Sequence, residues 1–323
     1  MVLKQSCFGF LFLFIACAFA SMSSAQTYPS KTLKVLVGFA PGSGPDLQAH
    51  AVSQQLALQL GQAVIIENKV GANGTIAARS VAQSNPDGYT LLFSSSSIAS
   101  TPYVYKNPGF DLLKDLRAVA SVGILDGLLV LVNAKSPIAN LGDLIEKAKK
   151  ERVMYGSPGV GNIIHLASES INLNAGIGME HIPYKGASEV MTGLLSDSIQ
   201  VMVATPPSVL NLVLEGKVRA IAFTGSKKFA PLPEVPLLKD AFPGFEPIGS
   251  WGIFFVPSKT PNDVVDRLNA AVRESIKINA VSALLQRDGY FPDHKNAQDI
   301  NAFFKNEVLR MKEPFRAAKI EPL

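Results

Sequence analysis

Short apolar runs alternate with segments of helical period from Leu33 almost to the end of the chain. This alternation is typical of α/β proteins, in which helices cover mostly parallel sheets. In the first part of the chain we expect helices over residues 45–60 and 74–83, and strands over residues 33–38, 63–67, 90–93, 117–123 and 128–132. The last two strands are adjacent. The pattern predicts a first α/β lobe.

The same pattern begins again after Asn133 and predicts a second lobe. Here we expect strands over residues 152–155, 180–182, 199–203 and 218–224, and helices over residues 141–149, 161–174, 188–195 and 208–214. The proline-rich stretch 227–247 reads as an irregular connection. A strand at 251–256 and helices at 261–276, 281–287 and 297–313 follow it. Periodicity does not assign this last third to either lobe.

The N-terminus has the layout of a secretory signal peptide. Lys4 precedes an apolar stretch over residues 7–20, which is shorter than the roughly 20 residues that span a bilayer. Small residues before Gln26 predict cleavage near Ala25, so we expect an exported protein in the periplasm. Lipid attachment at Cys17 is an alternative, although Phe14 stands where a lipobox usually has leucine.

The mature chain is expected to hold no cysteine, because both cysteines lie in the leader. It therefore forms no disulfide, and packing alone must stabilise it. The four histidines, at 50, 165, 181 and 294, lack the close spacing of metal ligands. We predict no metal and no cofactor.

The charge of the chain argues against nucleic-acid binding. Loss of Lys4 with the leader lowers the formal net charge from +4 to +3. The basic residues are scattered, without a stripe or interleaved aromatic residues. A mild positive field can still attract anions.

Two loops rich in glycine and serine each lie between a predicted strand and a predicted helix. Residues 39–46 read FAPGSGPD and residues 155–162 read YGSPGVGN. Such loops let backbone N–H groups approach an anion closely, although ordinary tight turns have the same composition. Leu47 stands where a dinucleotide-binding fingerprint has its third glycine, and no Gly-Lys-Ser/Thr follows the second loop.

Two further features accompany these loops. The run Ser94-Ser95-Ser96-Ser97 follows a predicted strand and is a third candidate loop, or a solvated turn. His165 lies one helical turn after Gly161, where it would support the loop, donate to a ligand, or bond to a neighbouring backbone group.

Signals of a hydrolase are missing from the sequence. Neither Ser43 nor Ser157 lies in a Gly-x-Ser-x-Gly motif. We expect a binding protein and no enzyme. A secreted esterase that uses either serine stays open, because catalytic triads assemble from distant parts of a sequence.

Several segments resemble the Bug family, the receptors of tripartite tricarboxylate transporters. They include, in one-letter code, YPSK at 28–31, FAPG at 39–42, ENKVGANG at 67–74, NPDGYTLL at 85–92, YKGA at 184–187, GKVRAIA at 216–222, PGFE at 243–246 and SWG at 250–252. The resemblance covers essentially the whole mature chain and keeps the order of the motifs.

The resemblance implies a type II-like periplasmic binding protein with two lobes and a ligand cleft between them. Residues 26–125 with 248–323 would form lobe 1, and residues 126–247 lobe 2. Such a receptor is a monomer that closes on a small carboxylate and delivers it to membrane transporter subunits, or reports it to a sensor kinase. Backbone amides, which do not titrate, would hold the ligand over a wide pH range. Carried over by position, the ligand-binding residues are Phe39, Ala40, Gly42, Ser43, Gly44, Ser94, Ser96, Ser157, Gly161, Asn162 and His165.

The chain departs from the family pattern at three places. Ser43 replaces the second glycine of the usual Pro-Gly-Gly, which predicts a different specificity. Gln200 stands at a usually acidic position, and Ala204-Thr205-Pro206 stands where many relatives carry an aspartate. An uncharged cleft wall favours an anionic or aromatic acid over an amino acid.

Overall fold

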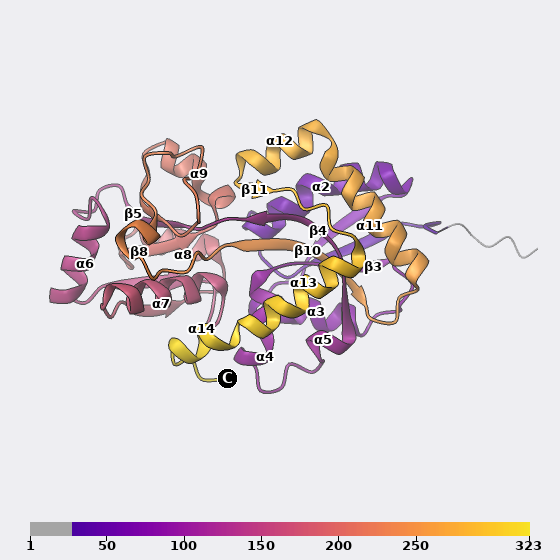
Figure 1. Cartoon of the computed structure of the whole chain (residues 1–323), viewed down its shortest axis with the longest axis horizontal. Helices are drawn as coiled ribbons and strands as arrows, with labels where there is room; N and C mark the ends of the chain where they lie inside the picture. The colour runs from indigo at the N-terminus through magenta and orange to yellow at the C-terminus, as the bar shows by residue number, and fades with distance from the viewer. Residues whose placement is uncertain (1–27) are drawn as a thin grey trace, which may run out of the picture. The chain divides into compact units, whose positions relative to one another are not determined.

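Two β-sheets run through residues 31–323, and helices flank both of them (Figure 1). The structure is a computed structural model that describes residues 28–323. Contacts divide the chain into residues 1–30 and residues 31–323, and the following description concerns the second unit. The predicted leader, its cleavage site and Cys17 lie outside the described residues. No helix in residues 28–323 is both long and apolar enough to cross a membrane.

The first sheet has six strands in the order β11-β4-β10-β3-β1-β2. They are β1 (Leu33–Val37), β2 (Val64–Asn68), β3 (Thr90–Ser95), β4 (Leu116–Leu125), β10 (Ser250–Pro257) and β11 (Tyr290–Phe291). Strands β1, β2 and β3 are parallel. Strand β10 pairs antiparallel with both β3 and β4, so a late segment of the chain occupies the middle of this sheet.

The second sheet has five strands in the order β7-β6-β8-β5-β9. They are β5 (Leu129–Asn133), β6 (Met154–Ser157), β7 (Glu180–Pro183), β8 (Val201–Ala204) and β9 (Val218–Phe223). Strand β6 is parallel to β7 and β8, whereas β5 is antiparallel to β8 and β9. Its core is apolar and includes the buried Leu129, Leu131 and Phe223.

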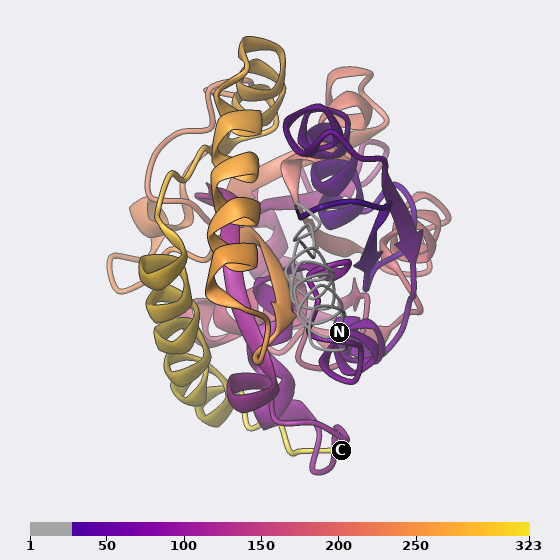
Figure 2. The same cartoon turned by 90° about the vertical axis from the view of Figure 1, so that its right-hand side faces the viewer.

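The helices flank these strands in sequence order. They are α2 (Gly44–Leu60), α3 (Thr75–Ala82), α4 (Thr101–Val104), α5 (Leu112–Asp115), α6 (Leu141–Lys150), α7 (Ile163–Ala175), α8 (Ala187–Leu195), α9 (Pro206–Leu214), α10 (Leu238–Ala241), α11 (Asn262–Lys277), α12 (Asn279–Arg287), α13 (Ala297–Arg310) and α14 (Lys312–Ala317), with 3-10 helices η1 (Ala72–Gly74) and η2 (Ser96–Ser100). Helices α11 and α13 both pack against β4 (Figure 2).

The chain passes between the two sheets twice, through residues 126–128 and 224–249. The buried Thr224 joins the two crossing segments: its Oγ1 accepts from Leu128 N–H over 2.7 Å and donates to the carbonyl of Ile248. The segments run so close that a Cβ on Gly249 would lie 1.9 Å from the carbonyl oxygen of Leu125. These two segments, joined to each other by the hydrogen bonds of Thr224, are the parts of the chain that connect the two sheets.

The predicted α/β fold with two sheets is confirmed, with three corrections. Both sheets are mixed rather than mostly parallel, because β5 and β10, the strands that follow the two crossing segments, each run antiparallel to both of their neighbours. The adjacent strands predicted at 117–123 and 128–132 correspond to β4 and β5, which belong to different sheets. The helix predicted over 297–313 ends at Arg310, because Pro314 lacks an N–H and its ring would clash with the carbonyl of Arg310.

Candidate functional site

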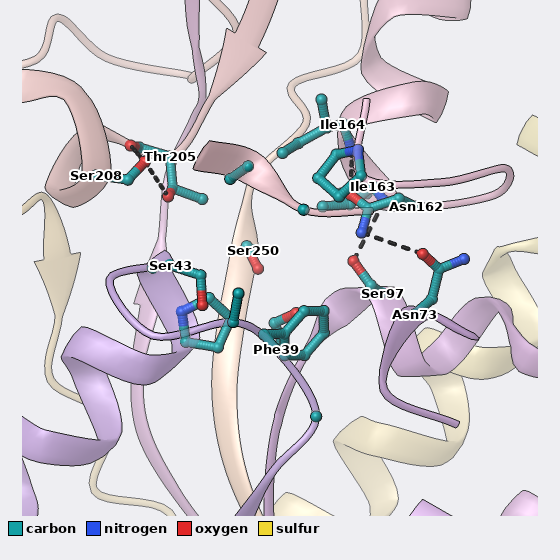
Figure 3. Close-up of a pocket in the computed structure, with 18 of the residues that line it drawn as sticks. Phe39, Ser43, Asn73, Ser97, Asn162, Ile163, Ile164, Thr205, Ser208 and Ser250 are labelled. Atoms are coloured by element: carbon teal, nitrogen blue, oxygen red, sulfur yellow. Dashed lines mark hydrogen bonds between the residues drawn. The ribbon is translucent and has the colours of Figure 1, made fainter. Parts of the chain in front are cut away.

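A pocket lies where loops that follow strands of both sheets meet (Figure 3). Its empty space is about 780 Å³, part of it open to solvent. The first sheet contributes the loop after β1, the turn at η1 and the end of β3. The second sheet contributes the starts of α7, α8 and α9.

The N-termini of four helices point at this pocket. Its lining includes Gly44 at the start of α2, Ile163 at the start of α7, Ala187 at the start of α8 and Thr205, the N-cap of α9. The N–H groups of a helical first turn have no intrahelical acceptor, and the helix dipole is positive there. Prolines at the first two positions of α9 carry no N–H, so this helix contributes its dipole and few donors.

The side chains that line the pocket are small, polar or apolar. Lys185 is the single charged residue among these lining residues, and none of them is an aspartate or glutamate. The pocket therefore has a positive bias from the backbone and from one side chain. No group of three or more His, Cys, Asp or Glu residues in the described range 28–323 is arranged to hold a metal ion.

Asp46 holds the first loop from inside the protein. One carboxylate oxygen accepts from Gly42 N–H over 2.9 Å, and the other accepts from the Asn68 side chain over 2.7 Å. The same Asn68 amide also donates to the carbonyl of Phe39 over 3.0 Å. The Gly42 N–H is thus committed to the protein, and this loop presents other groups to the pocket.

Ser43 lines the pocket, and its side chain does not cap its helix. It occupies the N-cap position of α2, where a serine normally accepts from a first-turn N–H, but its side chain makes no such bond. Its Oγ is buried and has no hydrogen-bond partner among the described residues. A buried hydroxyl without a partner costs free energy, so a ligand that bonds to it gains affinity.

The second loop satisfies most of its own N–H groups. Gly159 N–H donates to Ser157 Oγ over 3.2 Å, and Gly161 N–H donates to His165 Nδ1 over 2.9 Å. Ile163 N–H donates to Ser97 Oγ over 3.3 Å, and the next N–H in α7 donates to the Asn162 side chain over 3.0 Å. This loop is a braced turn in which these N–H groups already have acceptors.

Behind the second loop, aromatic side chains form a stack. The rings of His165 and His181 lie 3.9 Å apart at 13°, and Tyr155 stacks on His181 at 5.1 Å. Burial lowers the pKa of His165 to about 3, with a further contribution from His181, and burial lowers the pKa of His181 to about 4. Burial and the neighbouring Glu169 raise the pKa of Tyr155. All three rings are neutral near pH 7.

The structure divides the predicted site residues into three groups. Phe39, Ala40, Ser43, Gly44 and Asn162 line the pocket. Gly42, Ser157, Gly161 and His165 do not line it, and their hydrogen bonds hold the two loops in shape.

Ser94 and Ser96 are also absent from the lining of the pocket. The pocket is lined instead by Ser95 and Ser97, one residue further along the chain. Ser96 bonds to Ser250 through the two hydroxyls at 2.9 Å. Ser94 and Ser95 end strand β3, where neighbouring side chains lie on opposite faces, whereas Ser96 and Ser97 belong to the 3-10 helix η2.

Several lining residues were not predicted as site residues. Those with polar side chains are Asn73, Ser95, Ser97, Lys185, Thr205, Ser208, Ser250 and Tyr290. Asn73 and Lys185 belong to the segments ENKVGANG and YKGA. These segments supported the family resemblance, but neither residue was predicted to bind the ligand. Thr205 and Ser208 lie on one helical turn and their hydroxyls are 3.2 Å apart.

Residues 49–319 match the tripartite tricarboxylate transporter family receptor, and this match covers most of the chain. The chain belongs to this receptor family. The resemblance to the Bug family is confirmed by its relatives, which include a UPF0065 protein of Bordetella bronchiseptica and BugT of Bordetella pertussis. The first is 33% identical over 93% of this chain and 89% of the relative. BugT is 31% identical over 92% of this chain and 93% of its own length.

Solved receptor structures share this fold. The periplasmic binding protein BugD superposes with a TM-score of 0.86 at 28% identity, over 92% of this chain and 100% of BugD. The Rhodopseudomonas palustris protein Rpa4515, solved with adipate, gives a TM-score of 0.87 at 28% identity, over 92% and 100% of the two chains. MatC of the same organism, solved with bound malate, gives a TM-score of 0.82 at 26% identity, over 89% of this chain and 99% of MatC.

The structure also places the positions at which we expect this chain to depart from the family pattern. Ala204 and Thr205 line the pocket, next to the start of α9. Gln200 does not line it: its Oε1 accepts from Met154 N–H over 3.0 Å at the start of β6. The uncharged wall of the pocket therefore depends on Ala204 and Thr205.

Proposed function

We propose that this chain is a periplasmic receptor that captures a small organic carboxylate in the pocket between its two sheets. The observation that carries the proposal is the convergence of four helix N-termini on a space lined by one lysine and by no acidic residue. Each N-terminus stabilises an anion by roughly 0.3–1 kcal/mol. Two structural relatives were solved with dicarboxylates, which supports the same ligand class here.

The first loop is the proposed carboxylate cradle. Ser43 and Gly44 at the start of α2 line the pocket, although Pro45 in the first turn carries no N–H, and the start of α8 at Gly186 lies across from Ala40. The second loop has a different role, because its N–H groups are already bonded within the protein. It shapes the far wall through Pro158, Asn162 and Ile163.

Ligand binding is proposed to close two lobes, residues 26–125 with 248–323 and residues 126–247. The crossing segments joined at Thr224 are the proposed hinge. A ligand drives closure only by binding the closed form better than the open one, so it must contact both lobes. The closed monomer would then deliver its ligand to membrane transporter subunits.

A secreted hydrolase fits these contacts less well. Ser157 Oγ lies 2.6 Å from His181 Nε2, which brings a serine and a histidine together. However, the Ser157 side chain is fully buried and does not line the pocket. We propose that the pair braces the second loop and that the protein is no enzyme.

Mass spectrometry of small molecules released from natively purified protein tests the ligand class. We expect an organic acid, and a thermal-shift screen should then rank related carboxylates. Stabilisation by cations or neutral sugars alone would contradict the proposal. Loss of uptake of the identified acid in a deletion strain would separate transport from a sensory role, in which uptake persists.

A further inference from the structure

Asn73 connects the turn after β2 to the second loop across the pocket (Figure 3). Its side-chain amide donates to the carbonyl of Val160 over 2.7 Å. Its oxygen accepts from the side chain of Asn162 over a longer 3.4 Å. Both polar atoms of one side chain in the turn η1, which follows β2 of the first sheet, thus bond to the loop after β6 of the second sheet.

The backbone at this position favours asparagine. Asn73 has φ 53° and ψ 32°, in the left-handed region, within a turn that starts at Gly71 and ends at Gly74. Asparagine tolerates this conformation better than other residues except glycine. Asn73 is only 8% exposed, so its bonds are shielded from competing water.

A second contact acts on the same loop. Ser97 Oγ accepts from Ile163 N–H at the start of α7 over 3.3 Å. Asn162, which Asn73 contacts, also caps α7 through its own side-chain oxygen. Asn73 and Ser97 therefore fix the position of the start of α7, one wall of the pocket, from the first sheet.

We propose that Asn73 is a positioning residue that clamps the second loop against the first sheet whether or not a ligand is bound. The clamp biases the receptor toward the closed arrangement and raises its affinity for any ligand that closes it. This inference rests on the proposed closure. It adds that part of the closing free energy comes from the protein's own contacts.

The test measures lobe closure directly, by single-molecule energy transfer on the ligand-free protein. Residues 26–323 contain no cysteine, so in a protein that starts at Gln26 Leu58→Cys on α2 and Lys150→Cys on α6 provide two exposed dye sites. Asn73→Gly removes the side chain and keeps the left-handed backbone unstrained. We expect the variant to populate longer distances than its parent, and an unchanged distribution overturns the proposal.

Asp197→Gly is the matched control. Asp197 also has a positive φ, 63°, but lies in an exposed turn between α8 and β8. Asp197→Gly should leave the distance distribution as it is in the parent. An equal shift in Asp197→Gly and Asn73→Gly would mean that the added flexibility of glycine, and not loss of the clamp, causes the change. That result would overturn the proposal. Ser97→Ala removes the acceptor of the Ile163 N–H bond and so weakens the same clamp. It should shift the distances in the same direction as Asn73→Gly. If Asn73→Gly fails to fold, this second variant decides whether the clamp exists.

Affinity measurements separate a clamp from a direct ligand contact. With adipate and malate as probes, Asn73→Gly should lower the affinity for both ligands by the same factor. Loss of one or two hydrogen bonds corresponds to about 5- to 30-fold. Unequal factors would identify Asn73 as a ligand contact and overturn the clamp. If the parent binds no carboxylate, the proposed function fails, while the distance measurement still decides the clamp.

Discussion

His165 accepts a hydrogen bond at Nδ1 from the backbone N–H of Gly161, with 2.9 Å between the two nitrogen atoms. The bond needs a neutral imidazole, because a protonated ring has no acceptor. The pKa of about 3 caused by burial keeps the ring neutral in this position. The shape of the second loop therefore depends on a histidine that stays uncharged at physiological pH.

This dependence predicts that acid destabilises the protein. The pKa values of His165 and His181 are lowered to about 3 and about 4, whereas unfolded histidines titrate near 6.5. Below about pH 6.5 the unfolded state binds more protons, so stability falls as pH falls, by up to about 1.4 kcal/mol per pH unit for each histidine. Urea unfolding between pH 7.5 and pH 5 measures this slope.

His165→Asn should reduce the slope of stability against pH by the equivalent of about one bound proton. His294→Asn, at an exposed position, should leave the slope as it is in the parent. Equal slopes in the two variants would contradict the role given to the buried pair. Ligand affinity itself should vary little above pH 6.5, because backbone amides do not titrate.

Gly44→Ala should weaken binding by a steric effect on closure. A Cβ at this position would lie 2.5 Å from Thr205 Oγ1, at the contact between the starts of α2 and α9. The closed arrangement would have to open slightly, which we expect to cost about 1–3 kcal/mol. Thr205→Ala removes the nearest atom, so the double variant should recover part of the affinity lost by Gly44→Ala. Additive losses, measured by calorimetry, would rule out this contact as the cause.

Ser43→Ala should raise the stability of the ligand-free protein and change ligand preference. The variant removes a buried hydroxyl without a partner among the described residues. We expect malate to lose more affinity than succinate, by about 1 kcal/mol, if the hydroxyl bonds to an oxygen substituent beside the carboxylate. Equal losses for the two acids would show that Ser43 does not select this substituent.

Lys185→Gln should weaken the binding of dianions more than the binding of monoanions. Lys185 is the single charged residue in the lining and is exposed, so the expected loss is modest, about 0.5–1 kcal/mol at low salt. Lys185→Arg should retain the affinity and its salt dependence. A loss that is the same for a dicarboxylate and its monomethyl ester would argue against an electrostatic role.

The sequence predicts the longer strands and helices of this fold because their ends are well marked, but it does not predict the short elements α4, α5, α10 and β11. Gly61 after α2 and Gly176 after α7 adopt the left-handed conformation that ends a helix. The central position of β10 was not predictable, because its pairing with β3 and β4 joins residues far apart in the chain. Periodicity describes each strand and carries no information about its neighbours.

The candidate site was predictable in outline and not in detail. The glycine pattern located both loops, but it could not distinguish Ser43, which faces the pocket, from Gly42, whose N–H bonds to Asp46. Gly161 suggested close approach to a ligand. The structure instead shows that a Cβ there would lie 2.1 Å from a side-chain methyl group of Val104, so packing against α4 requires this glycine.

Isothermal titration of one acid and its primary amide tests the central claim most directly. The acid identified by mass spectrometry and the amide of nearly equal shape differ mainly in charge. Helix N-termini and Lys185 stabilise the carboxylate, so the acid should bind at least about tenfold more tightly, a difference of about 1.4 kcal/mol. Equal affinities, or tighter binding of the amide, would contradict a pocket built for an anion.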